Sequence, residues 1–192
     1  MGPWVSEVVR AVVLFVLLGV VLWMMNRLHE KKAARADLLE QKYAVMTKTL
    51  LCAIPDAELL EAVIANLHAK QDPKQPDPYC TLPLLSHERA LVYSVWLVSK
   101  ELETGTMGAL LGGPSAPFCE YAVEGLTQMG AVTAAKALSD AMEATTPEAV
   151  ANCGVDYQNA VAWELPLSRC VTYIRENAAA FLDEEGEEYG EN

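Results

Sequence analysis

The chain has 192 residues, 52% of them hydrophobic, and carries a formal net charge of −12. An acidic chain repels nucleic-acid phosphates, so the composition argues against direct nucleic-acid binding. Its five cysteines are irregularly spaced, with no Cys-x-x-Cys pair and no histidine at ligand spacing, which indicates no disulfide framework, no metal site and no cofactor.

The chain begins with an apolar segment, in which residues 11–25 carry no charge and basic residues follow at once. A membrane-spanning helix needs about 20 residues, and extending the segment back toward the N-terminus supplies that length. We therefore predict a single-pass transmembrane anchor over residues 1–26. The residues expected to hold it in lipid are Trp4, Leu14, Phe15, Leu18 and Trp23.

The orientation of this anchor follows from its basic flank, formed by Arg27, Lys31, Lys32 and Arg35. Positive residues favour the cytoplasmic side of a membrane, so we expect the N-terminus outside and the C-terminal domain in the cytoplasm. The unpaired cysteines agree with a reducing compartment. The sequence thus predicts a protein of the bacterial inner membrane, with lipid as one partner.

A juxtamembrane helix is expected over residues 27–54, because residues 31–48 are rich in helix formers and Pro55 ends the pattern. Its apolar face either docks on the following domain or pairs with a second copy of the chain.

Charge is divided unevenly: residues 1–50 have a net charge of +3, whereas residues 51–192 have −15. The part after the anchor is therefore strongly acidic.

Residues 55–182 are expected to form one compact domain of five or six helices, since strand signals are nearly absent. Pro55 opens a helix over 56–70, and a proline-rich loop covers 72–85. Ser86 caps a helix over 87–103. The residues predicted to form the buried stripe of that helix are Leu91, Val95, Val98 and Leu102.

The second half of the domain begins with a glycine-rich connection over 105–117, which lacks the pattern of a phosphate-binding loop. Further helices are expected over 118–129 and 132–144. Thr146 and Pro147 open a short helix, and Pro166 opens the last one, to about residue 182. Residues 183–192 read as a disordered acidic tail. The fold class is therefore all-α.

Four carboxylates stand out as a candidate binding face: Glu101, Glu103, Glu120 and Glu124. Glu120 and Glu124 are four residues apart and share one face of their helix. Paired carboxylates can serve acid–base chemistry or bind a metal, but no histidine or further ligand stands at helical spacing. A solvated acidic face and a surface for a basic partner are the other interpretations.

Residues 85–105 contain the aromatic pair Tyr93 and Trp96 followed by Glu101, and residues 122–138 contain a Gly130-Ala131 step. Over about residues 80–145 this pattern resembles a bacterial helical family named after the C-terminal domain of a DNA-mimic protein. The Asn-Gly-Gly-Phe turn typical of that family is replaced here by residues 104–107, Thr-Gly-Thr-Met. The resemblance implies an all-helical fold and, in one branch, acidic side chains that imitate DNA phosphates and occupy a DNA-binding protein.

The resulting hypothesis is a non-enzymatic, membrane-anchored acidic domain that binds another protein, with a basic partner favoured by electrostatic steering. DNA mimicry is a special case of it. The alternative is a structural scaffold that self-associates as a homo-oligomer through the anchor and the juxtamembrane helix. An enzyme is the third possibility, for which the sequence offers no motif.

Overall fold

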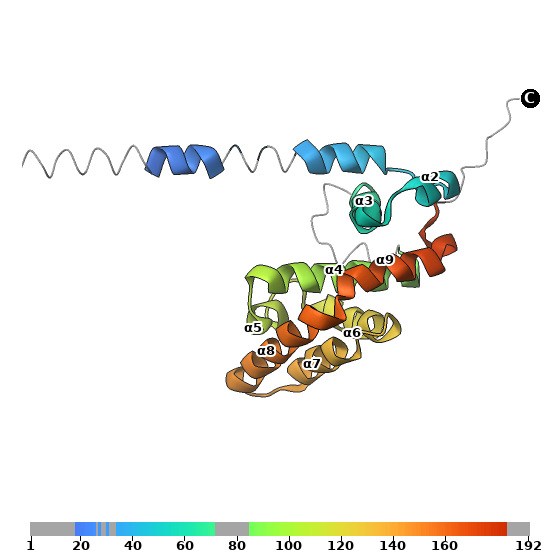
Figure 1. Ribbon diagram of the computed structural model, residues 1–192. Helices are drawn as coiled ribbons and strands as arrows, with labels where there is room; N and C mark the ends of the chain where they lie inside the picture. Colours follow the sequence, from blue (N-terminus) through green and yellow to red (C-terminus); the bar gives the residue numbers. More distant parts are fainter. Residues whose placement is uncertain (1–17, 26, 28–29, 31–33, 72–84, 184–192) are drawn as a thin grey trace, which may run out of the picture. The chain divides into compact units, whose positions relative to one another are not determined.

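The computed structural model describes residues 18–25, 27, 30, 34–71 and 85–183. Every regular element in these ranges is a helix, so the all-α prediction is confirmed for them (Figure 1). The chain divides into two compact units, Met1–Lys42 and Tyr43–Asn192.

The N-terminal unit contains helical residues 18–25 and 34–42. Leu18 and Trp23 are more than half exposed, and the Arg27 guanidinium lies 5.2 Å from the Trp23 ring centroid. No helix in the described part of the chain is long and apolar enough to cross a membrane.

That finding corrects the predicted transmembrane anchor, and with it the single-pass inner-membrane localisation that depended on the anchor. Several residues named for the anchor and its flank lie outside the described residues: Trp4, Leu14, Phe15, Lys31 and Lys32. The same holds for residues 72–84 of the proline-rich loop and for 184–192 of the acidic tail. Arg35 lies in the helical stretch 34–42.

The helix predicted to run on to residue 54 is interrupted after residue 42. The Asn66 side-chain amide donates to the carbonyl oxygens of Tyr43 (2.8 Å) and Ala44 (3.2 Å), which stabilises the turn at this point. Helix α2 (Lys48–Ala53) then starts anew, with the Thr47 hydroxyl accepting from the Leu50 amide. A side chain from a distant helix therefore holds the break, and no local signal announces it.

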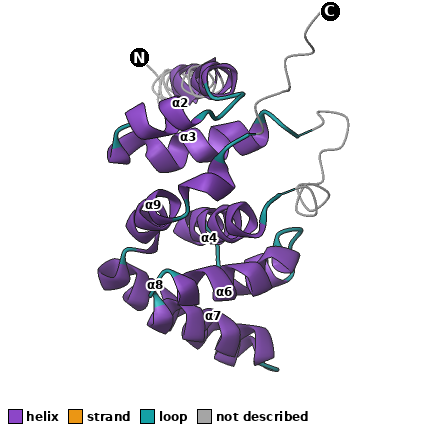
Figure 2. Ribbon diagram, turned by 90° about the vertical axis from the view of Figure 1, so that its right-hand side faces the viewer, coloured by secondary structure: helices purple, strands orange, loops and turns teal. Residues whose placement is uncertain are grey.

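The second unit is arranged in three layers, which Figure 2 shows edge-on. Helices α2 and α3 form one layer, α4 and α9 the middle one, and α6, α7 and α8 the third (Figure 2). The elements after α2 are α3 (Asp56–His68), α4 (His87–Thr104), α5 (Met107–Leu111), η2 (Ala116–Phe118), α6 (Cys119–Gln128), α7 (Val132–Glu143), α8 (Pro147–Glu164), α9 (Pro166–Glu176) and η3 (Ala178–Phe181). The described residues after Pro55 thus form seven α-helices and two 3₁₀ helices.

The predicted helix starts are confirmed by their caps. The Ser86 hydroxyl accepts from the Arg89 amide at the start of α4, and the Thr146 hydroxyl accepts from the Ala149 amide at the start of α8. Pro166 opens α9 as expected. Three elements differ from the prediction. Helix α8 is long rather than short, and a separate helix, α5, forms within the glycine-rich connection. Helix α9 ends at Glu176 rather than near residue 182, and the 3₁₀ helix η3 follows it.

Helix α4 lies at the centre of this unit. Its predicted stripe is confirmed, because Leu91, Val95 and Val98 are fully buried and Leu102 nearly so. Helix α6 approaches it closely at Gly125, where a Cβ atom would lie 2.9 Å from Cγ2 of Val95. The absence of a side chain at this position therefore sets the distance between the two helices.

Helix α7 is capped by a residue from another helix. Its own N-cap position, Ala131, has no side-chain acceptor, and the Glu164 carboxylate accepts from the amides of Thr133 (2.9 Å) and Ala134 (2.8 Å) instead. Burial of this carboxylate raises its pKa, but the hydrogen bonds from Ala134 and Thr133 outweigh burial and hold the pKa below its ordinary value. Glu164 thereby joins the end of α8 to the start of α7.

Candidate functional site

The four carboxylates singled out in the sequence lie on α4 and α6. Glu101 is half-buried and accepts a hydrogen bond from the hydroxyl of Ser115, which is itself buried. It thereby ties the loop before η2 to α4. The Glu101 carboxylate is therefore already engaged within the domain.

The other three acids are exposed, but only one of them is unengaged. Glu103 pairs with Lys100 at 2.8 Å, and Glu124 accepts from His87 and Gln128, both at 2.9 Å. Glu120 makes no hydrogen bond or ion pair with any described residue. Three of the four acids therefore already have partners within the domain, and their role in binding another protein stays a prediction.

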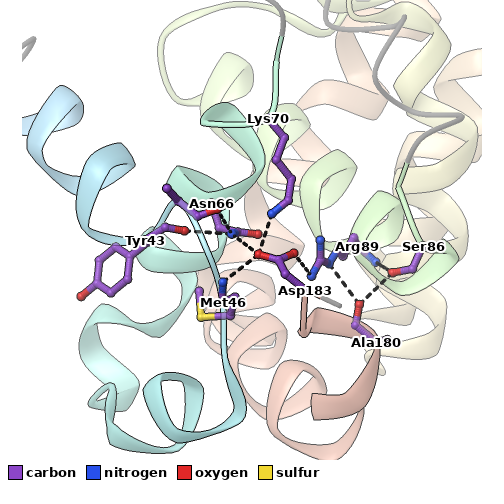
Figure 3. A network of polar contacts seen from close by, with 9 residues as sticks. Tyr43, Met46, Asn66, Lys70, Ser86, Arg89, Ala180 and Asp183 are labelled. Carbon is purple, nitrogen blue, oxygen red and sulfur yellow. Dashed lines mark hydrogen bonds and ion pairs between the residues drawn. The ribbon is translucent and has the colours of Figure 1, made fainter. Parts of the chain in front are cut away.

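A partly buried network of polar contacts surrounds Asp183 (Figure 3). Oδ2 of Asp183 accepts from the Met46 amide (2.7 Å) and the Asn66 amide group (2.9 Å), and pairs with Nζ of Lys70 at 2.6 Å. Oδ1 accepts from the Arg89 guanidinium at 2.9 Å. Two cations and two neutral donors thus converge on one carboxylate.

The remaining polar groups of the Asp183 network are also paired. Arg89 Nε and the Ser86 hydroxyl both donate to the Ala180 carbonyl at 3.0 Å, and the Asp183 amide donates to the Met46 carbonyl at 2.9 Å. Burial of the Asp183 carboxylate raises its pKa, but the hydrogen bonds and cations outweigh burial and hold the pKa well below its ordinary value. The network joins α3 and α4 to the segment that follows η3.

The described part of the chain contains a large groove between α5, α7 and α8, here called the α8 groove. Its volume is about 1130 Å³, and it is open to solvent. One wall is formed by α5 and the loops beside it, with Met107 and Leu111; the other is formed by α8, with Val150 and Val155. Met142, near the end of α7, also lines it.

The lining of the α8 groove is uncharged and mostly apolar. Eight of its twenty residues are Gly or Ala, which would allow the backbone of an occupant to approach closely. Its polar side chains are three threonines, Gln158 and Asn159, and Gln158 already donates to the Leu102 carbonyl at 2.7 Å. The lining contains no carboxylate, histidine, cysteine or lysine, so its chemistry suits binding rather than acid–base catalysis.

No carboxylate lines the α8 groove. Glu143, Glu148 and Asp156 are exposed and stand next in sequence to lining residues. None of the three forms a hydrogen bond or a close ion pair with a described residue. Among the described residues, no group of three or more Asp, Glu, His or Cys side chains is arranged so that it could hold a metal ion.

The sequence did not single out the α8 groove, although two of its signals were present. The segment 147–164 is rich in Ala and Val, yet the structure buries only Tyr157, Ala160 and Glu164 of it. The glycine-rich connection over 105–117 was read as an irregular link, but Thr106 caps α5 within it. A long apolar helix beside a glycine-rich segment could have indicated an unfilled groove.

Comparisons with known proteins return no match: no protein-family model, no curated protein and no solved structure is similar to this chain. The likeness to the DNA-mimic family over residues 80–145 therefore stays a prediction.

Proposed function

We propose that the domain formed by residues 43–183 is a non-enzymatic protein-interaction module that binds a helix of another protein in the α8 groove. The observation that supports this most is the groove itself, an open apolar channel of about 1130 Å³ without a charged residue in its lining. Open apolar channels between helices are a recurrent docking site for the apolar face of a partner helix.

The dimensions of the α8 groove suit a helix. Along α8 it extends from Pro147 to Asn159, which corresponds to roughly 18 Å at 1.5 Å per residue. A helix about 10 Å across and equally long occupies roughly 1400 Å³. The groove can therefore take most of three turns of a partner helix, whose outer side would remain in solvent.

The polar chemistry of the walls also favours a helix over an extended peptide. The groove is walled by helices and has few free side-chain donors or acceptors, so the backbone of an extended peptide would lose its hydrogen bonds to water without replacement. A helix satisfies its backbone internally and can bury apolar side chains at no such cost. The same reasoning disfavours a small polar substrate.

A matched pair of variants tests this proposal. Val155 on α8 lines the groove and is 59% exposed, whereas Val132 at the start of α7 does not line it and is 58% exposed. Burying a valine side chain is worth about 1.5 kcal/mol, or roughly tenfold in affinity. The probe is a fluorescent 18-residue amphipathic peptide with a Leu/Ala face and Gln elsewhere, and its anisotropy reports binding to the full-length protein.

We expect Val155→Gln to weaken binding of this peptide roughly tenfold and Val132→Gln to leave it within twofold. Both variants should keep the helical circular dichroism of the wild type, since both side chains are already exposed. Equal effects of the two substitutions, or no measurable binding by the wild type, would refute the groove as the docking site.

A further inference from the structure

We infer that the last described residues of the chain, 178–183, form a strap that holds the α2–α3 layer on the rest of the domain. Releasing this strap opens the layer about a hinge at Arg175, while the helices of the third layer stay folded. None of the residues that line the α8 groove belongs to the strap, α2 or α3. The inference is therefore independent of the proposed function.

On one side the strap is bonded to the α2–α3 layer (Figure 3). The Met46 amide donates to Oδ2 of Asp183 at 2.7 Å, and the Asp183 amide donates to the Met46 carbonyl at 2.9 Å. Oδ2 also accepts from the Asn66 amide group at 2.9 Å and pairs with Nζ of Lys70 at 2.6 Å. These contacts reach the turn before α2, the last turn of α3 and the residues that follow α3.

On its other side the strap is bonded to the start of α4. The Ala180 carbonyl accepts from the Ser86 hydroxyl and from Nε of Arg89, both at 3.0 Å, and Oδ1 of Asp183 accepts from the Arg89 guanidinium at 2.9 Å. Phe181 is only 1% exposed, and η3 lies against α2, α4 and α9. The strap therefore joins two layers through polar contacts and through a buried aromatic side chain.

Neither η3 nor α2 has the length to be stable by itself. Helix η3 has four residues and α2 has six, whereas isolated helices shorter than about 12 residues are marginal in water. The turn before α2, residues 43–47, contains no glycine or proline that would impose its shape. Asn66 and Asp183 hold its backbone instead. The positions of these elements therefore depend on the contacts of the strap.

A second tie fixes the opposite end of the α2–α3 layer. Arg175 of α9 donates to the carbonyl oxygens of Leu51 at 2.7 Å and Ile54 at 2.5 Å, and it pairs with Asp56 at 2.8 Å. Along α3, Asp56 and Asn66 are separated by about 15 Å at 1.5 Å per residue. A layer that is tied at two points this far apart can pivot on one of them when the other is released.

Hydrogen exchange followed by mass spectrometry on the full-length protein at pH 7 tests this inference. In the wild type we expect the amides of α2 and α3 to exchange together and faster than those of α7 and α8. Asp183→Ala should accelerate exchange in α2 and α3 by about a hundredfold or more, because breaking a buried ion pair shifts an equilibrium by at least that factor. Exchange in α7 and α8 should change by less than about threefold.

A milder pair of variants decides the question if Asp183→Ala does not fold. Lys70→Gln removes an ion pair with the strap, and Lys136→Gln removes the ion pair that Lys136 makes with Asp140 on α7. An exposed ion pair is worth a factor of roughly 1.4 to 5. We expect Lys70→Gln to accelerate exchange in α2 and α3 by roughly two- to fivefold, and Lys136→Gln to leave it unchanged.

The pattern of acceleration along the chain separates the outcomes. Faster exchange confined to α2, α3 and the strap supports the inference. Equal acceleration of all helices in a folded strap variant would overturn it, because the opening would then be global unfolding, and so would wild-type rates in α2 and α3. Neither result bears on peptide binding in the α8 groove, which Val155→Gln tests separately.

Discussion

Asp183 is the residue whose removal should test the architecture most directly. Its side chain is only 13% exposed, and its carboxylate accepts from two neutral donors and two cations. In Asp183→Ala the Arg89 guanidinium, whose side chain is 9% exposed, would keep only its hydrogen bond to Ala180. A buried cation left without its counter-charge is costly, whereas the pair with the more exposed Lys70 matters less.

The expected magnitude follows from these exposures. Removing one partner of a buried ion pair costs about 3–5 kcal/mol, and an exposed pair contributes less than about 1 kcal/mol. We therefore expect Asp183→Ala to lower the free energy of unfolding by about 3–5 kcal/mol at pH 7. At roughly 3 °C per kcal/mol for a domain of this size, the Tm should fall by about 10 °C.

The pH dependence supplies an independent check. The folded-state pKa of Asp183 is depressed, so the carboxylate stabilises the fold above its unfolded pKa of about 3.9, and this stabilisation is lost as pH falls through the folded pKa. The stability difference between wild type and Asp183→Ala should thus be full at pH 7 and shrink below about pH 4.

Urea titrations followed by circular dichroism at pH 7 and at acidic pH would measure both effects. Glu120→Ala is the control, because this exposed acid has no hydrogen bond or ion pair with the described residues and should change stability by less than about 0.5 kcal/mol. A loss below about 1 kcal/mol for Asp183→Ala at pH 7, or one that does not shrink in acid, would refute the reasoning.

Three further substitutions or measurements address the core. Ser94 is fully buried, and its hydroxyl has no partner among the described residues, so Ser94→Ala should raise the Tm in a thermal melt; a loss of more than about 1 kcal/mol would contradict this. Gly125→Ala should lower the free energy of unfolding by about 1–3 kcal/mol, despite a helix-propensity gain of about 1 kcal/mol. Gly108→Ala, where the nearest contact of the added Cβ would be at 3.9 Å, should leave this free energy unchanged or raise it in the same urea titration. Burial, and to a lesser extent a neighbouring carboxylate, raises the pKa of the Cys119 thiol to about 11. Mass spectrometry after maleimide treatment should therefore find the exposed Cys52 labelled in the native protein and Cys119 labelled only after unfolding.

Much of the helical framework could be predicted because its signals are local. Ser86 and Thr146 are caps, Pro166 starts a helix, and the spacing of apolar residues in 87–104 marks the face that α4 buries. These features depend on residues within one or two turns of each other, and hydrogen bonding over that range is set by chain geometry. The transmembrane prediction was also local, resting on hydropathy, and the described helices contradict it.

The candidate site depended on contacts between distant segments. Glu101 accepts from Ser115, fourteen residues later, and Glu164 accepts from the amide of Ala134, thirty residues earlier. Asp183 collects donors from residues up to 137 positions away. No periodicity encodes such pairings, because they depend on how the helices are placed in space.

What the sequence by itself determined about this protein is its all-helical class, the positions of most helices and the acidity of the part that follows residue 50. Only the tertiary structure decided that α5 and α8 leave an apolar groove between them. The physical reason is that helix formation is decided over a few residues, whereas a concave surface exists only where several helices fail to fill the space between them.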